Sequence, residues 1–97
     1  MGDVWTALDT RLDRTVALKT SAERFSDRFA NEARIIASLN HPNICTLFDV
    51  GPDFLVMEYI DGKTLDRLIP RKGMNLGDAL HYAIEIVGAL CAAHACV

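Results

Sequence analysis

Two charged residues lie where the surrounding pattern calls for apolar side chains. In "TVALKT" the two-residue repeat of a strand places Lys19 on the same face as Ala17, in an otherwise apolar segment. Further along, Glu32 falls between Phe29 and Ile36 at helical spacing, so a helix would put its carboxylate on the apolar face. Because burying an unpaired charge is costly, one interpretation is an ion pair between Lys19 and Glu32, which would fix an ammonium group in place.

The same pattern leaves a second interpretation equally open. Lys19 could extend from a sheet edge so that its ammonium group reaches water, and Glu32 could sit at the rim of its helix face. The pattern alone gives no preference between the buried pair and the two solvated charges.

Short strands and a helix must position these two residues. Two β-like runs, Val4 to Leu8 and Thr15 to Lys19, are joined by a polar connection and predict a hairpin. A helix is predicted from about Glu23 to Leu39, and the turn-forming segment 40–43 closes it; the apolar residues at helical spacing are Phe25, Phe29, Ile36 and Leu39.

The remainder of the chain predicts a second hairpin followed by two helices. "ICTLFDV" and "DFLVMEYI" are strand-like and flank the turn signal Gly51-Pro52. "DGKTLDRLI" then predicts a turn and a short helix. A long amphipathic helix follows, with Asn75 as its cap and Asp78 in its first turn; its apolar face contains Leu76, Leu80, Ile84, Val87 and Leu90. The composition shifts from strand-rich to helical near residue 60, which is the expected boundary.

The composition argues for a folded domain and against some classes of protein. With 97 residues, 51% of them hydrophobic and 24% charged, we expect one folded domain. A net charge of −3 without a basic stripe argues against nucleic acid as a partner. The most apolar stretch, "AIEIVGALCAAHACV", is too short for the roughly 20 residues of a membrane span. The odd number of cysteines, Cys45, Cys91 and Cys96, favours reduced thiols in a cytoplasmic protein.

Five motifs in order and spacing resemble one family. These are "VALK", Glu32 within "FANEAR", "LNHPNI", "FLVMEYIDG" and "TLDRL", and together they resemble the N-terminal lobe of bacterial serine/threonine protein kinases. "MGDV" is similar to the end of that family's glycine-rich loop, with Gly2 as the last glycine and Val4 as the valine. The resemblance implies an α+β fold, with an antiparallel sheet of about four strands plus the C-helix, followed by two helices of the C-terminal lobe. Residues 1–60 would be the end of the N-lobe and residues 61–97 the start of the C-lobe.

The resemblance also implies roles for individual residues, with ATP as the ligand. Lys19 would hold the α- and β-phosphates of ATP, and Glu32 would pair with Lys19 to fix its position. Gly2 belongs to the phosphate loop. The implied adenine and ribose contacts are Val4 and Ala17 packing on the ring, Met57 as gatekeeper behind it, backbone groups of Glu58 and Ile60, and Asp61 near the ribose.

Other motifs of the family do not occur in this sequence. The H-R-D loop with its base, the metal-binding Asn, the D-F-G aspartate and A-P-E are missing, so magnesium ligands are absent and the chain as given is expected to be inactive. Met1 is therefore expected to be an internal methionine of a longer kinase; the competing interpretation is a myristoylation signal on Gly2 with Thr6.

Two classes of function follow from this resemblance. The first is the ATP-binding portion of a serine/threonine kinase, with protein substrates only in the complete enzyme. The alternative is a non-catalytic interaction module or a relic without function. In either case the first strand has an open edge and the long helix an uncovered apolar face, so self-association of the isolated chain is expected.

Overall fold

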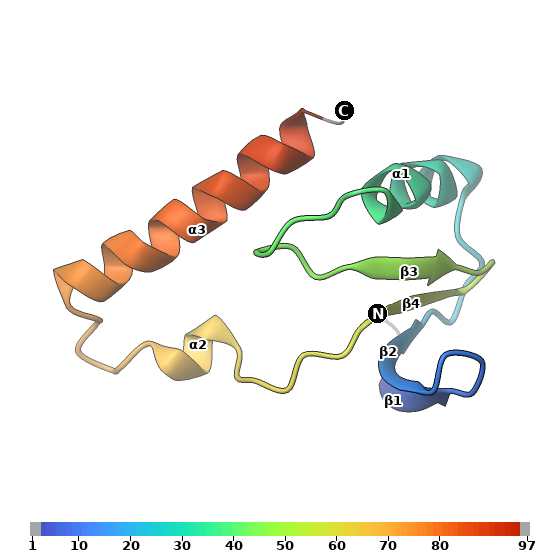
Figure 1. Ribbon diagram of the computed structural model, residues 1–97, viewed down its shortest axis with the longest axis horizontal. Coiled ribbons are helices and arrows are strands. Elements are labelled where there is room, and N and C mark those ends of the chain that lie inside the picture. The colour runs from blue at the N-terminus through green and yellow to red at the C-terminus, as the bar shows by residue number, and fades with distance from the viewer. Residues whose placement is uncertain (1–2, 96–97) are drawn as a thin grey trace.

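The computed structural model describes residues 3–95, so the predicted phosphate-loop residue Gly2 lies outside the described part. Four strands and three helices follow one another along the chain (Figure 1). They are β1 (Val4–Asp9), β2 (Arg14–Thr20), α1 (Asp27–Ala37), β3 (Leu47–Val50), β4 (Phe54–Glu58), α2 (Leu65–Leu68) and α3 (Leu76–His94).

The four strands form one antiparallel sheet in the order β1-β2-β4-β3. Both predicted hairpins are present, and β2 pairs with β4 to join them into one sheet. The predicted α+β class and the four-strand sheet are therefore confirmed. β1 is an edge strand, as expected, and β3 is the other edge.

Helix α1 begins later than the predicted start at Glu23. Ser26 has an extended conformation, and its Oγ accepts a hydrogen bond from the backbone N–H of Phe29 at 3.1 Å, which caps the helix. Phe25 matches the helical spacing but lies before the cap, where its backbone N–H donates to the carbonyl of Pro52 at 2.7 Å. The prediction was wrong here because this tertiary hydrogen bond holds Phe25 outside the helix.

The end of α1 also differs from the predicted Leu39. The Ser38 hydroxyl donates to the carbonyl of Ile35 at 2.6 Å, and regular helix stops before Ser38. Leu39 lies in the turn that follows. Within that turn Nδ1 of His41 accepts a hydrogen bond from the backbone N–H of Asn43 at 3.0 Å, so His41 has a structural role in this connection.

The buried core is small and lies in the sheet and α1. The buried apolar residues among the described ones are Val16 (4% exposed), Ala33 (5%) and Leu47 (9%). Ala33 and Leu47 lie between α1 and the sheet. Val16 lies on the opposite face, where the Arg14 guanidinium stacks 3.8 Å from the ring centre of Phe48.

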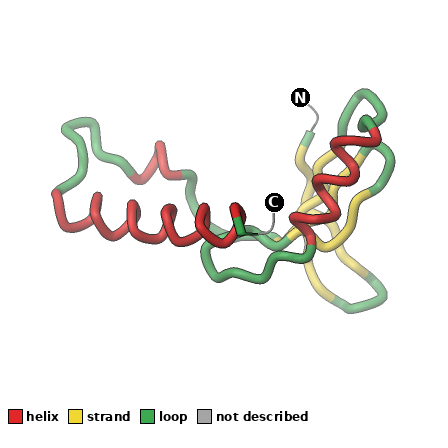
Figure 2. Tube along the Cα trace, turned by 90° about the horizontal axis from the view of Figure 1, so that it is seen from above, coloured by secondary structure: helices red, strands yellow, loops and turns green. Residues whose placement is uncertain are grey.

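The long helix α3 lies beside the sheet rather than over it (Figure 1, Figure 2). The predicted cap is confirmed, since Oδ1 of Asn75 accepts from the backbone N–H of Asp78 at 2.9 Å. No described residue of α3 is buried, and Ile84 is 71% exposed. A direct polar link to the rest of the molecule comes from Asn43, whose Nδ2 donates to Oε2 of Glu85 at 2.7 Å.

Helix α3 has 19 residues, which is close to the length of a membrane-spanning helix. Within residues 3–95, α3 is the one helix that is long and apolar enough to cross a bilayer, judged by length and composition alone. The sequence-based prediction concerned residues 83–97, whereas α3 begins earlier, at Leu76. Two polar side chains of α3, His81 and Glu85, nevertheless pair at 2.8 Å, and Glu85 also binds the loop at Asn43.

Candidate functional site

Strand pairing brings four of the predicted site residues together. Val4 lies directly opposite Lys19, and Ala17 lies directly opposite Met57. Because directly opposed residues on antiparallel strands share a face, and residues two apart on one strand do too, all four lie on one face of the sheet. We call this the Lys19 face.

Helix α1 packs over part of the Lys19 face and leaves a hollow there. The hollow has a volume of about 260 Å³ and is mostly apolar; it is lined by Phe29, Glu32, Ala33, Ile36, Cys45, Leu47, Leu55 and Met57. The sequence analysis did not single out Leu55, which lies directly opposite Lys19 in the sheet. The signal was available, because Leu55 and Met57 are two residues apart on one strand.

The expected ion pair between Lys19 and Glu32 is not formed in the described part of the chain. Oε1 of Glu32 instead accepts from Nε of Arg28 at 3.1 Å, one helical turn earlier. The Glu32 side chain is 59% exposed and sits at the rim of the hollow, as in the second interpretation of the sequence. Lys19 is half-buried, and no carboxylate of the described residues lies within 4.0 Å of its ammonium group.

The segment after Met57 contains the other predicted adenine and ribose contacts. The backbone N–H of Glu58 donates to the carbonyl of Thr46 at 2.8 Å, and Oε1 of Glu58 accepts from the Thr46 N–H at 3.2 Å. The carbonyl of Ile60 accepts from the N–H of Gly62 at 3.1 Å. The side chains of Glu58, Ile60 and Asp61 are exposed.

The thiol of Cys45 lies at the junction of the hollow and this segment. Its Sγ contacts the backbone carbonyl of Glu58 at 3.5 Å. Cys45 is exposed overall, but partial burial of its thiol raises the pKa above its ordinary value, and the negative charge of Glu58 adds to the effect; a backbone hydrogen bond with Glu58 lowers the pKa and opposes both. The thiol form is favoured, so Cys45 is a poor nucleophile at neutral pH.

The described residues do not assemble a metal centre. Within residues 3–95, no group of three or more His, Cys, Asp and Glu side chains could hold an ion together. No chemical step is assigned to metal on this chain.

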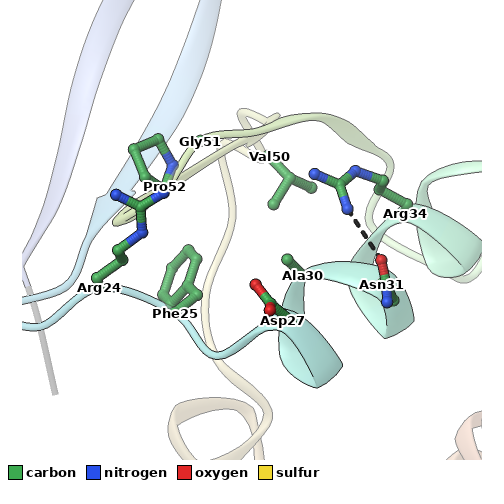
Figure 3. A pocket seen from close by; sticks show the side chains of 9 residues that line it. All are labelled: Arg24, Phe25, Asp27, Ala30, Asn31, Arg34, Val50, Gly51 and Pro52. Atoms are coloured by element: carbon green, nitrogen blue, oxygen red, sulfur yellow. Dashed lines mark hydrogen bonds between the residues drawn. The ribbon is translucent and has the colours of Figure 1, made fainter.

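A larger hollow lies on another side of α1, away from the predicted site residues. It has a volume of about 510 Å³ and is lined by Arg24, Phe25, Asp27, Ala30, Asn31, Arg34, Val50, Gly51 and Pro52 (Figure 3). Arg24 and Arg34 stand on opposite sides of it, and Nη1 of Arg34 donates to Oδ1 of Asn31 at 3.0 Å (Figure 3). None of the residues predicted to bind ATP lines this hollow.

Comparisons with known proteins identify the family. The protein kinase domain model matches residues 1–97. The serine/threonine-protein kinase PknA of Mycobacterium tuberculosis is 39% identical over 111 aligned residues, covering 98% of this chain and 26% of that kinase. PrkC of Bacillus subtilis is 37% identical over 105 residues, covering 97% of this chain and 16% of PrkC.

A third relative, the kinase PknL of Mycobacterium tuberculosis, is 40% identical over 102 residues, covering 94% of this chain and 26% of PknL. The chain thus spans about a quarter or less of these relatives. The family match extends over both the sheet and α3, so the two parts belong to one domain type. This chain therefore belongs to the protein kinase domain family, and its relatives there are bacterial serine/threonine protein kinases.

Proposed function

We propose that these residues form the ATP-binding portion of a serine/threonine protein kinase. In the complete domain the reaction is transfer of the γ-phosphoryl group of ATP to a serine or threonine hydroxyl of a protein substrate. The family membership supports this class of reaction, and the site described above supports the assignment of ATP to this part of the domain.

One observation carries the proposal. The strand register gathers Val4, Ala17, Lys19 and Met57 on one face of the sheet, although they come from three strands. Three of these side chains are apolar and suit a flat aromatic base, whereas the ammonium group suits phosphate oxygens. Because Lys19 has no ion-pair partner among the described residues, its charge is available to a phosphate group.

Each site residue then has one task in binding. Lys19 neutralises charge on the α- and β-phosphates, and Val4 and Ala17 pack on the adenine while Met57 lies behind it. Backbone groups of Glu58 and Ile60 bind the adenine edge, Asp61 lies near the ribose, and Gly2, outside the described residues, belongs to the phosphate loop. Glu32 fixes Lys19 in the competent arrangement of the complete domain, which requires it to leave Arg28.

Phosphoryl transfer itself needs residues that this sequence does not contain. The family's catalytic base, its metal-binding Asn and its D-F-G aspartate have no counterparts in the 97 residues. We therefore propose that this chain by itself binds ATP without transferring phosphate. The complete protein would act on protein substrates, with its kinase domain in the cytoplasm.

Thermal stabilisation by magnesium-ATP tests this proposal. The chain should melt at a higher temperature in millimolar magnesium-ATP, because a ligand that binds only the folded state stabilises it by mass action, by about 2.7 kcal/mol at a hundred times its Kd. Lys19→Met should lose most of this shift and fold normally in far-UV circular dichroism. Lys72→Met removes the same charge from an exposed loop, and this variant should retain the shift in melting temperature. Equal shifts in both variants would contradict the assignment of Lys19.

A second candidate function is a non-catalytic interaction module. It is favoured by the uncovered apolar face of α3, where Leu76 is 74% and Ile84 71% exposed, and by the open edge of β1. A partner, or a second copy of the chain, would then cover these surfaces. The module predicts no stabilisation by magnesium-ATP and a concentration-dependent mass in light scattering, whereas a nucleotide-dependent shift in a monomer supports the kinase assignment.

A further inference from the structure

We infer that Arg28 is a positioning residue that competes with Lys19 for the carboxylate of Glu32. This inference rests on the proposed function, because it gives the Lys19–Glu32 pair a role in ATP binding. It adds a residue of this chain, Arg28, whose contact with Glu32 sets how often that pair can form.

Arg28 contacts Glu32 along the surface of α1. Nε of Arg28 and Oε1 of Glu32 are 3.1 Å apart, four residues apart on the same helix, which is the spacing at which helical side chains meet. The Arg28 side chain is 89% exposed, so the contact holds the carboxylate toward solvent at the rim of α1.

Away from Arg28, the Glu32 carboxylate has the hollow to enter. Glu32 lines the hollow between α1 and the sheet, and Leu55, the direct strand partner of Lys19, lines the same hollow. A change in the Glu32 side-chain rotamer is the local way for its carboxylate to turn from Arg28 toward the Lys19 face. The hollow of about 260 Å³ is space into which it can turn.

Arg28 competes only weakly for the Glu32 carboxylate. An exposed pair at this spacing is weak, because water screens the charges and two long side chains must be ordered. Removal of Arg28 should therefore change the population of the Lys19–Glu32 pair by about twofold rather than by orders of magnitude. Arg28 biases the arrangement of Glu32 without locking it.

The first test measures how often the Glu32 carboxylate lies near Lys19 when no nucleotide is bound. A carbodiimide couples a carboxylate to a nearby amine, and the yield of the Glu32–Lys19 cross-link in monomeric chain is measured by peptide mass spectrometry. Arg28→Gln should raise this yield about twofold. The control is Arg34→Gln, which removes the same charge from α1 but breaks a contact with Asn31 instead. An unchanged yield, or an equal rise in Arg34→Gln, overturns the inference.

The second test measures nucleotide affinity, by titrating the chain with a fluorescent ATP analogue in the presence of magnesium. Arg28→Gln should tighten binding about twofold, and the gain should vanish in the Glu32→Gln background. If the tighter binding persists in the Glu32→Gln background, Arg28 acts through its charge alone. That result would overturn the inference. If no variant binds the analogue while the cross-link yield rises, the proposed function fails and the competition for Glu32 stands.

Discussion

The structure predicts that two leucines of equal size contribute very differently to stability. Leu47 on β3 is 9% exposed and lies against α1, whereas Leu76 at the start of α3 is 74% exposed. Replacing Leu47 by alanine removes three carbon atoms, worth about 0.8 kcal/mol each in buried apolar surface. A cavity term adds to this, so we expect a loss of about 3 kcal/mol, and Leu76→Ala should change the free energy of unfolding by less than about 0.5 kcal/mol.

Urea unfolding followed by circular dichroism measures both values. With a slope of about 1.5 kcal/mol per molar urea, the midpoint of Leu47→Ala should fall by about 2 M and that of Leu76→Ala by less than about 0.4 M. Measurements at several protein concentrations separate folding from self-association, because a monomer's midpoint does not depend on concentration. Equal shifts for the two variants, or no cooperative transition in the parent chain, would refute the view that the sheet and α1 form the core.

Two further predictions concern α1 and the hollow beneath it. Ser26→Ala should lower the free energy of unfolding by about 1 kcal/mol, because the Ser26 hydroxyl caps α1, and Ser26→Asp should retain most of the stability; an unaltered urea midpoint in Ser26→Ala would contradict the cap. The raised pKa of Cys45 predicts slow alkylation by iodoacetamide at neutral pH, with a rate that rises only at a higher pH than for free cysteine, as followed by mass spectrometry. Glu58→Gln should move the rise in rate to lower pH, since the Glu58 charge is one cause of the shift; a rise at the pH of free cysteine in the parent chain would contradict the assigned environment.

Local sequence patterns predicted most of the elements. The two β-like runs at Val4 to Leu8 and Thr15 to Lys19, joined by a polar connection, predicted one hairpin, and the turn signal at Gly51-Pro52 predicted another. The sheet contains both. Asn75 was identified as a cap from its position before an apolar repeat, and its hydrogen bond to the Asp78 N–H confirms it. These features depend on interactions between residues close in the chain, so the sequence is sufficient to predict them.

The limits of α1 show what local patterns miss. Phe25 fits the apolar repeat of the helix, and the pattern therefore extended the helix through it. In the structure the Phe25 N–H is bound to Pro52, a residue far away in the sequence, and Ser26 caps the helix instead. Both hydrogen bonds form together, and the one to Pro52 joins segments far apart in the sequence, so local patterns do not reveal it.

The sequence by itself determined that Ala17 and Lys19 share a strand face and that the chain resembles a kinase lobe, and this resemblance alone implied the roles of Val4 and Met57. The tertiary structure decided which strands are neighbours, and so that these residues share one face with Leu55. It also decided that Glu32 binds Arg28 and not Lys19. Helical spacing fixes which residues share a face of α1, but the partner of a carboxylate at the rim of that face depends on how the helix packs on the sheet.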